Sequence, residues 1–239
     1  MAAAAEEAGA TAEVQEAKPL VLRSLYEVQE SNGVASSSCS RVCYAATLAA
    51  GTAGRKVSDW HAAAVEAGST GIALVQEGSV VGVVESSSEG VTAFLRALAA
   101  YDAVGEASVL ALSEDCPARA FAEHRTATGI KMEHADFDLV EDAVVNASFA
   151  LYASLLAVGR KLKADRMSAA DKAAAYANLK NYCGPGQGDL VPAGDTVVGF
   201  ATSEHTQSLA DCLALYDAPI NVKLGSELVW PVPQVLTLR

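Results

Sequence analysis

Histidine side chains are the first candidates for catalysis or metal binding in this sequence. The chain contains four of them, His61, His124, His134 and His205. They fall in different parts of the chain and form neither a His-x-His nor a His-Glu-x-x-His spacing, the patterns that bring two imidazoles to one metal ion. We therefore expect no metal site.

Cysteine and acidic residues give no stronger signal for catalysis. The five cysteines are Cys39, Cys43, Cys116, Cys183 and Cys212. They form no Cys-x-x-Cys pair, and an odd, scattered set is typical of reduced thiols in a cytosolic protein. Adjacent acids indicate solvated surfaces, and no Gly-x-Ser-x-Gly motif is present. We expect no enzyme; a small enzyme that uses Cys39, Cys43 or a histidine is an alternative that would need an unusually reactive thiol.

The chain is strongly acidic, which limits its partners. Its 239 residues include 17 Lys and Arg against 29 Asp and Glu, and the net charge is −12. Nucleic acids and anionic membranes are bound through Lys and Arg, so this balance argues against both. We expect the partners to be other proteins.

The sequence shows no export signal that we can identify and no clear membrane span. Residues 1–18 are rich in Ala and Glu without a basic start, and we interpret them as a disordered tail. The longest apolar run, Ala143–Val158, is about four residues shorter than a bilayer span. We interpret it as a buried or docking helix of a soluble, cytoplasmic protein.

The first half of the chain is predicted to follow a β-α-β-β-α-β order. The expected elements are a strand at Leu20–Val28, a long loop at Glu30–Lys56 with a short helix near Tyr44–Ala50, a helix at Ser58–Ala67, strands at Gly71–Val75 and Ser79–Glu85, a helix that begins at Ser88, and a strand at Ala107–Leu112. The hairpin turn Gln76-Glu77-Gly78 is the clearest feature, because its glycine can adopt a positive φ. This order predicts an α+β ferredoxin-like sandwich.

The second half is predicted to be mainly helical. The expected elements are a fifth strand at Ile130–Phe137, a helix from a capping box at Asp138–Glu141 to Lys163, a helix from Ser168 to Cys183, a strand at Thr196–Ala201, a helix at Glu204–Ala218 and an extended stretch at Ile220–Pro233. The glycine-rich residues 184–189 follow a helix and lack a Lys-Ser/Thr pair, so they indicate a linker and not a phosphate loop. We divide the chain into the tail 1–18, a domain at 19–183, and a linker with a small α/β extension at 184–239.

Four segments of the predicted domain resemble, in the correct order, the BLUF family of flavin-binding blue-light sensors. They are Arg23–Val28, against the family's Arg-Leu-x-Tyr-x-Ser; Thr70–Leu74, against Thr-Gly-hydrophobic; Val80–Glu85, against Phe-Leu-Gln-x-Leu-Glu; and Leu112–Phe121, against a segment that ends in Arg-x-Phe. The resemblance covers about Leu20 to Asp138 and implies the BLUF-like form of the ferredoxin-like fold. Thr70–Gly90 and Ser113–Phe121 also resemble ciliary and testis-expressed proteins with degenerate BLUF domains, which implies a part of the cilium.

The resemblance also implies which residues would hold a flavin, and most of them differ here. In the family a strand-three Gln and a helix-one Asn bind the flavin ring, and a strand-one Tyr completes the photochemical relay. Tyr26 matches the Tyr, but Gly82 stands at the Gln position. The helix-one stretch Trp60–Ala64 has no Asn or Gln, and His124 replaces a Trp. A flavin would leave two or three buried polar groups unpaired, at roughly 1–3 kcal/mol each, so we expect no cofactor and only a vestigial pocket at Tyr26 and Gly82.

The strand Val80–Glu85 carries apolar side chains on both faces. A strand exposed on one side would alternate with polar residues, so both of its faces must be covered. The cover is either the chain's own C-terminal helices or a partner chain, and the sequence leaves both open.

These observations lead to one hypothesis and one alternative. The hypothesis is a non-catalytic structural or docking subunit of a large cytoskeletal assembly, the ciliary or flagellar axoneme, without a flavin. Its expected partner contacts are Trp230, Pro231, Val232 and Pro233, because an extended proline-rich segment loses little entropy on docking and a Trp can anchor it; packing of this tail on its own C-terminal unit is equally consistent. The alternative is a flavin-binding blue-light photoreceptor with a rearranged pocket.

Overall fold

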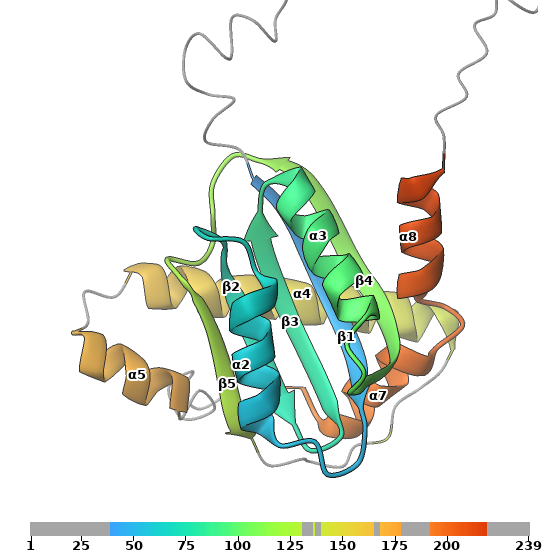
Figure 1. The fold of residues 1–239 in the computed structure, drawn as a ribbon, viewed down its shortest axis with the longest axis horizontal. Helices are drawn as coiled ribbons and strands as arrows, with labels where there is room; N and C mark the ends of the chain where they lie inside the picture. The colour runs from blue at the N-terminus through green and yellow to red at the C-terminus, as the bar shows by residue number, and fades with distance from the viewer. Residues whose placement is uncertain (1–38, 131–135, 137–139, 165–167, 178–191, 219–239) are drawn as a thin grey trace, which may run out of the picture. The chain divides into compact units, whose positions relative to one another are not determined.

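A six-stranded sheet lies at the centre of the molecule (Figure 1). The computed structural model describes residues 39–130, 136, 140–164, 168–177 and 192–218. The strands are β1 (Cys39–Leu48), β2 (Thr70–Gln76), β3 (Ser79–Ser86), β4 (Val104–Cys116), β5 (His124–Ile130) and β6 (Gln207–Ser208), in the spatial order β5-β2-β3-β1-β4-β6. All neighbouring strands are antiparallel except β2 and β5, which are parallel.

Helices cover both faces of this sheet (Figure 1). The helices are α2 (Gly54–Ala64), α3 (Ser88–Ala99), α4 (Glu141–Ala164), α5 (Ala169–Ala177), α7 (Gly194–Thr202) and α8 (Leu209–Asp217). Helices α2, α3 and α8 pack on one face, and α4, α5 and α7 on the other. The order β1-α2-β2-β3-α3-β4, with β1 and β3 in the middle, is the ferredoxin-like arrangement. The predicted α+β ferredoxin-like class is therefore confirmed.

The first strand of this arrangement is not the predicted one. The sequence suggested a loop over Glu30–Lys56 with a short helix near Tyr44, whereas Cys39–Leu48 forms the long central strand β1. Its Ser and Ala residues resemble a loop in composition, but a strand between two others is selected by packing more than by intrinsic preference. Every residue from Cys39 to Ala46 is buried. The predicted strand Leu20–Val28 lies outside the described residues.

The hairpin and the helix after it are confirmed. Strands β2 and β3 pair through a turn in which Gly78 has a φ of 79°. Ser87 caps α3 by accepting a hydrogen bond from the backbone N–H of Gly90. Such signals lie within a few residues of each other, so they can be recognised in the sequence alone.

One predicted strand of the second half is wrong, and another lies mostly outside the described residues. The fifth strand is His124–Ile130, and most of the predicted strand Ile130–Phe137 falls on residues that the structure does not describe. The apolar stretch Thr196–Ala201 belongs to helix α7, with Val197, Phe200 and Ala201 buried at helical spacing. A short apolar run does not distinguish a buried helix from a buried strand, which explains the error. The predicted helix Glu204–Ala218 is shorter, because residues 207–208 form β6 and α8 begins at Leu209.

The chain's own helices cover the valine-rich strand β3. Val80 and Val84 belong to the apolar cluster under α2 and α3, whereas Val81 and Val83 belong to the cluster under α4 and α7. No partner chain is needed to bury these four side chains. Helix α4 is long and apolar enough to cross a bilayer by composition, but eight of its residues are buried.

Candidate functional site

A buried tyrosine and a histidine share a hydrogen bond between the sheet and helix α2. Tyr44 stands in the middle of β1, and its hydroxyl contacts Nε2 of His61 on α2. Neither residue has measurable exposure to solvent. Burial, and to a smaller extent Cys43, raises the pKa of Tyr44 above its usual value. Burial, then the neighbouring His124, lowers the pKa of His61 to about 3, so the pair is neutral at physiological pH.

A second imidazole stacks on the first. His124, at the start of β5, lies with its ring centre 4.6 Å from that of His61, at an interplanar angle of 14°. Burial lowers the pKa of His124 to about 4. His61 Nδ1 and His124 Nε2 are buried without a hydrogen-bond partner among the described residues. Two of the histidines that look unrelated in the sequence therefore meet, but no third metal-binding side chain joins them in the described part of the chain.

Aromatic rings fill the rest of the space between α2 and α3. Phe94 of α3 lies with its ring centre 5.2 Å from that of Tyr44 and 5.1 Å from that of His61. At the end of this group, Trp60 and Tyr101 stack with ring centres 4.5 Å apart and nearly parallel planes. We call Tyr44, Trp60, His61, Phe94, Tyr101 and His124 the aromatic cluster. It occupies the sheet face on which α2 and α3 pack.

Gly82, named in the predicted vestigial pocket, lies directly beside this cluster. It pairs with Tyr44 on β1 and with Ala73 on β2. A Cβ atom added at Gly82 would lie 2.6 Å from the carbonyl oxygen of Ile72 and 3.0 Å from the Tyr44 hydroxyl. No side chain therefore fits at this position unless the neighbouring strand moves.

The tyrosine that the structure places opposite Gly82 is Tyr44. Arg41 and Tyr44 repeat the Arg-x-x-Tyr spacing of Arg23 and Tyr26, and Tyr44 stands on the central strand opposite Gly82. Tyr26 lies outside the described residues, as do the expected docking residues Trp230, Pro231, Val232 and Pro233. Sequence reasoning chose the earlier copy of the spacing because it sits in a segment richer in β-forming residues.

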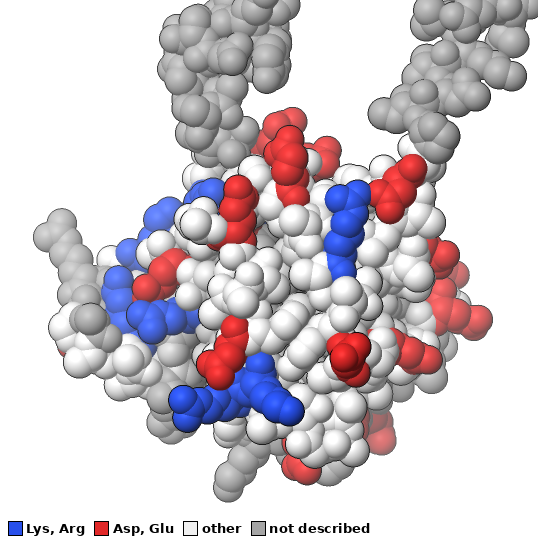
Figure 2. All heavy atoms as spheres, viewed as in Figure 1, with Lys and Arg blue, Asp and Glu red and all other residues white. Residues whose placement is uncertain are grey.

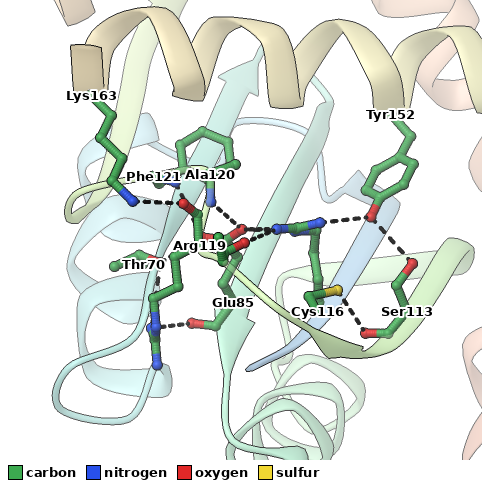
Figure 3. Close-up of polar contacts among 11 residues, drawn as sticks. Thr70, Glu85, Ser113, Cys116, Arg119, Ala120, Phe121, Tyr152 and Lys163 are labelled. Carbon is green, nitrogen blue, oxygen red and sulfur yellow. Dashed lines mark hydrogen bonds and ion pairs between the residues drawn. The ribbon is translucent and has the colours of Figure 1, made fainter. Parts of the chain in front are cut away.

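A second group of polar residues is centred on the buried carboxylate of Glu85 (Figure 3). One of its oxygens accepts hydrogen bonds from Arg41 Nε at 2.7 Å and from the backbone N–H of Ala120 at 2.8 Å. The other accepts from Thr70 at 2.7 Å and from the backbone N–H of Phe121 at 3.2 Å. Burial alone would raise the pKa of Glu85, but these hydrogen bonds outweigh it and hold the pKa below its usual value. The carboxylate is thus charged and fully paired.

The same group extends to the loop after β4 and to helix α4 (Figure 3). Arg119 Nη1 donates to the carbonyl oxygens of Gly68 at 2.9 Å and Glu85 at 3.1 Å. Lys163 Nζ, from the end of α4, donates to the Arg119 carbonyl at 2.7 Å. Arg41 Nη2 donates to the carbonyl of Ala118 at 3.0 Å, and its other branch reaches the Tyr152 hydroxyl. We call Arg41, Thr70, Glu85, Arg119, Ala120 and Phe121 the Glu85 network.

The Glu85 network explains why three of the resembling segments occur together. Thr70, Glu85 and the Arg119–Phe121 segment were quoted from different parts of the chain, and they meet at one carboxylate. Every partner is a protein group, so the network joins β1, β2, β3 and the loop before β5. Its contribution is to hold the fold together.

The cysteines in the described part of the chain are buried. They are Cys39, Cys43, Cys116 and Cys212. Burial raises the pKa of Cys43 to about 12 and raises the pKa values of Cys39 and Cys212. A catalytic thiol needs the opposite shift, because the thiolate is the nucleophile.

Comparison with known proteins gives low-similarity structural neighbours only. No protein-family profile matches the chain, and no curated protein is significantly similar to it in sequence. A bacterial light-regulated adenylyl cyclase is 15% identical over 48% of this chain and 34% of its own, with a TM-score of 0.35. A structure described as BlrP1 BLUF is 16% identical over 62% of this chain and 96% of its own, with a TM-score of 0.34.

A further neighbour is Klebsiella pneumoniae BlrP1 with FMN and cyclic diGMP, which is 14% identical over 61% of this chain and 36% of its own, with a TM-score of 0.33. The chain spans about a third of the length of the light-regulated cyclases that it matches. The fold class rests on the strand order and helix packing described above, because TM-scores this low carry no weight. These comparisons do not bear on the ciliary group.

Proposed function

We propose that this protein is a non-catalytic docking subunit of a large protein assembly, built on a BLUF-like domain that does not use a flavin. The observation that carries this proposal is the aromatic cluster. Tyr44 bonds to His61 of its own chain, and Gly82 offers no amide at the position where a flavin-binding Gln would stand. The face that would receive a ligand is closed by side chains of the same molecule.

The burial of the cluster supports the flavin-free part of the proposal, and the cost of opening the cluster can be approximated. Tyr44, His61 and Phe94 each have 0% exposure, so a ring system could enter only by displacing them. Re-exposing one large buried apolar side chain costs roughly 1.5–3 kcal/mol. A flavin ring would also leave its polar groups without the amide partners that the resemblance implies, at roughly 1–3 kcal/mol each.

Exposed apolar residues and a net negative charge support docking to proteins. Phe149 and Val145 are large apolar side chains of α4 that are more than half exposed. The chain's charge of −12 disfavours binding to nucleic acids and anionic membranes. We extend the proposal to the ciliary or flagellar axoneme as the assembly, on the basis of the resemblance of Thr70–Gly90 and Ser113–Phe121 to ciliary proteins.

Absorption spectroscopy tests the flavin-free part of the proposal. The full chain is purified, incubated with a molar excess of FMN or FAD, and passed through a desalting column. We expect a colourless protein with no band in the flavin region and no red shift on blue illumination. A yellow protein whose spectrum shifts in light would establish the photoreceptor alternative.

Localisation and pull-down test the docking part. A fluorescently tagged full chain expressed in ciliated cells should concentrate along the axoneme and stay there after detergent extraction, because structural subunits resist extraction. A diffuse signal that detergent removes would exclude the axonemal assignment. Native pull-down with mass spectrometry then identifies the partners.

A further inference from the structure

Strand β4 has a long edge that the described part of the chain leaves without a neighbour. β4 runs from Val104 to Cys116, but β6 pairs only with its residues Ser108 and Val109. From Leu110 onward, Ala111, Leu112, Ser113 and Cys116 pair with β1 on one side, and no residue of this stretch pairs with a described strand on the other. The backbone N–H and C=O groups along such an edge can accept an added strand.

An apolar groove runs along this edge. It has a volume of about 470 Å³ and is lined by Val109–Leu112 of β4, by Val145, Ser148 and Phe149 of α4, and by residues 205–207. Phe149 is 72% exposed and Val145, one turn before it, is 54% exposed. Two large apolar side chains on one helix therefore stand beside an unpaired strand edge, where alternate side chains of an added strand would meet them.

Acidic side chains lie on β4 and α4, two of the elements that line this groove, close in sequence to the lining residues. Glu141 and Asp142 are exposed in the first turn of α4, just before Val145, and Asp115 is exposed at the end of β4. The neighbouring Glu114 accepts a hydrogen bond from Tyr216 of α8. No Lys or Arg is among the residues that line the groove. Figure 2 shows acidic side chains along the right-hand margin of the molecule, beside α8, and most Lys and Arg on the left of this face.

We propose that this edge binds an extended segment of a partner protein in which apolar residues alternate with Lys or Arg. The segment adds as a strand beside Leu110–Asp115, its apolar side chains contact Phe149 and Val145, and its basic side chains face the acids at the ends of the groove. A second copy of this chain fits less well, because each copy carries the same acids and a charge of −12. The inference rests on the proposed docking function and names the chemistry of the partner.

Fluorescence anisotropy on the full chain tests this surface. The probe is a labelled peptide of alternating Lys and Val, and the reference is the same peptide with Glu in place of Lys. We expect the Lys peptide to bind, the Glu peptide not to bind, and Phe149→Ser to weaken binding by about tenfold, as expected for an aromatic anchor. Leu215→Ser on α8, which is 68% exposed and outside the groove, is the matched control and should leave the affinity unchanged.

Amide hydrogen exchange locates the bound strand. The Lys peptide should slow the exchange of amides in Leu110–Asp115 in the wild type and less so in Phe149→Ser. Because Phe149 is mostly exposed, this variant should melt at the same temperature as the wild type, so a loss of binding is not a loss of fold.

Four results would overturn the inference. They are no binding of the Lys peptide, equal binding of the Glu peptide, equal affinity of Phe149→Ser, and a dimer of the full chain that Phe149→Ser dissolves, which would make a second copy the occupant. If Phe149→Ser still captures the partners found by pull-down, the docking function stands and this surface is wrong. If no partner is captured but the peptide binds as expected, the groove stands as a peptide-binding surface and the proposed docking function is wrong.

Discussion

The Glu85 network and the aromatic cluster both include a residue of β1, Arg41 and Tyr44, but they are built in different ways. In the network a charged carboxylate receives four hydrogen bonds from three segments of the chain. In the cluster rings fill the space, and only one hydrogen bond, between Tyr44 and His61, joins them. The network contains the residues that match the BLUF pattern, whereas the cluster contains the positions that differ from it.

The difference shows which parts of a ligand-binding pattern are tied to the fold. Arg41, Thr70 and Glu85 satisfy one another, so losing one of them leaves a buried charge unpaired. Gly82 and His124 hold no buried charge that must be paired, so apolar and aromatic neighbours can fill the space around them. Substitutions in the two regions should therefore have different sizes and different pH dependences.

The largest expected effect is that of Glu85→Gln. It removes the charge that pairs with Arg41, which is itself buried, and should lower the free energy of unfolding by about 3–5 kcal/mol. Urea denaturation followed by circular dichroism measures this change. Glu123→Gln is the matched control: its ion pair with Arg125 is exposed, so the change should stay within about 1 kcal/mol. Similar losses of stability in both variants would mean that the buried ion pair of the network contributes no more than an exposed one.

Gly82→Gln should have the next largest effect on stability. It restores the amide of the flavin pattern, but its Cβ meets the backbone of β2 at 2.6 Å, and overpacking of this kind costs about 3 kcal/mol. Gly54→Ala on α2, whose added Cβ would meet Thr128 at 3.4 Å and Val75 at 3.9 Å, both ordinary contacts, should change stability by less than about 0.5 kcal/mol. A stable Gly82→Gln protein that binds FMN would show that one residue closes the pocket.

His61 should make the cluster sensitive to mild acid. Its pKa is about 3 in the folded protein, below the ordinary 6.5, so the unfolded chain binds the proton first and stability falls as the pH drops below 6.5. Between pH 7 and pH 5 this histidine should account for a loss of about 2 kcal/mol. Chemical denaturation at each pH should show a smaller loss in His61→Gln. An unchanged pH profile would contradict the buried, neutral imidazole.

The network should respond in a lower pH range. The pKa of Glu85 is below its usual 4.5, so its contribution is present above that value and is lost as the pH falls through the folded pKa. Glu85→Gln should therefore flatten the stability profile only below pH 4.5, whereas His61→Gln flattens it from about pH 6.5 down to about pH 3.

Tyr44→Phe should have the smallest effect. It keeps the ring and removes only the hydroxyl, which leaves His61 Nε2 unpaired at a cost of about 1–2 kcal/mol. Tyr216→Phe is the control, since its hydroxyl reaches only the exposed Glu114, at 3.4 Å, and its loss should be within about 0.5 kcal/mol. Equal losses in a thermal or urea melt would mean that the buried hydrogen bond adds nothing.

Local signals allowed the sequence to predict the β2-β3 hairpin, the start of α3 and the ferredoxin-like class. They did not reveal β1, because its Ser and Ala residues resemble a loop and only its two neighbours in the sheet make it a strand. Without β1, the sequence could not choose Tyr44 over Tyr26.

The aromatic cluster and the Glu85 network depend on contacts between distant segments. His124 reaches His61 because β5 runs parallel to β2 at the edge of the sheet, a pairing that no local pattern encodes. The departures at Gly82 and His124 were visible in the sequence, but their convergence on one cluster was not. In the network, Thr70 and Glu85 meet through the hairpin register, in which the two residues are paired.

The labelling rates of the buried thiols measure how often different parts of the fold open transiently. A thiol reagent reacts only with an exposed sulfur, so each cysteine is labelled at the frequency with which its surroundings separate. Cys43 in the central strand reports rupture of the whole sheet, whereas Cys212 reports detachment of α8. With Cys183 replaced by Ser, the ratio of these two rates would tell how often the C-terminal helix lifts away while the rest stays intact.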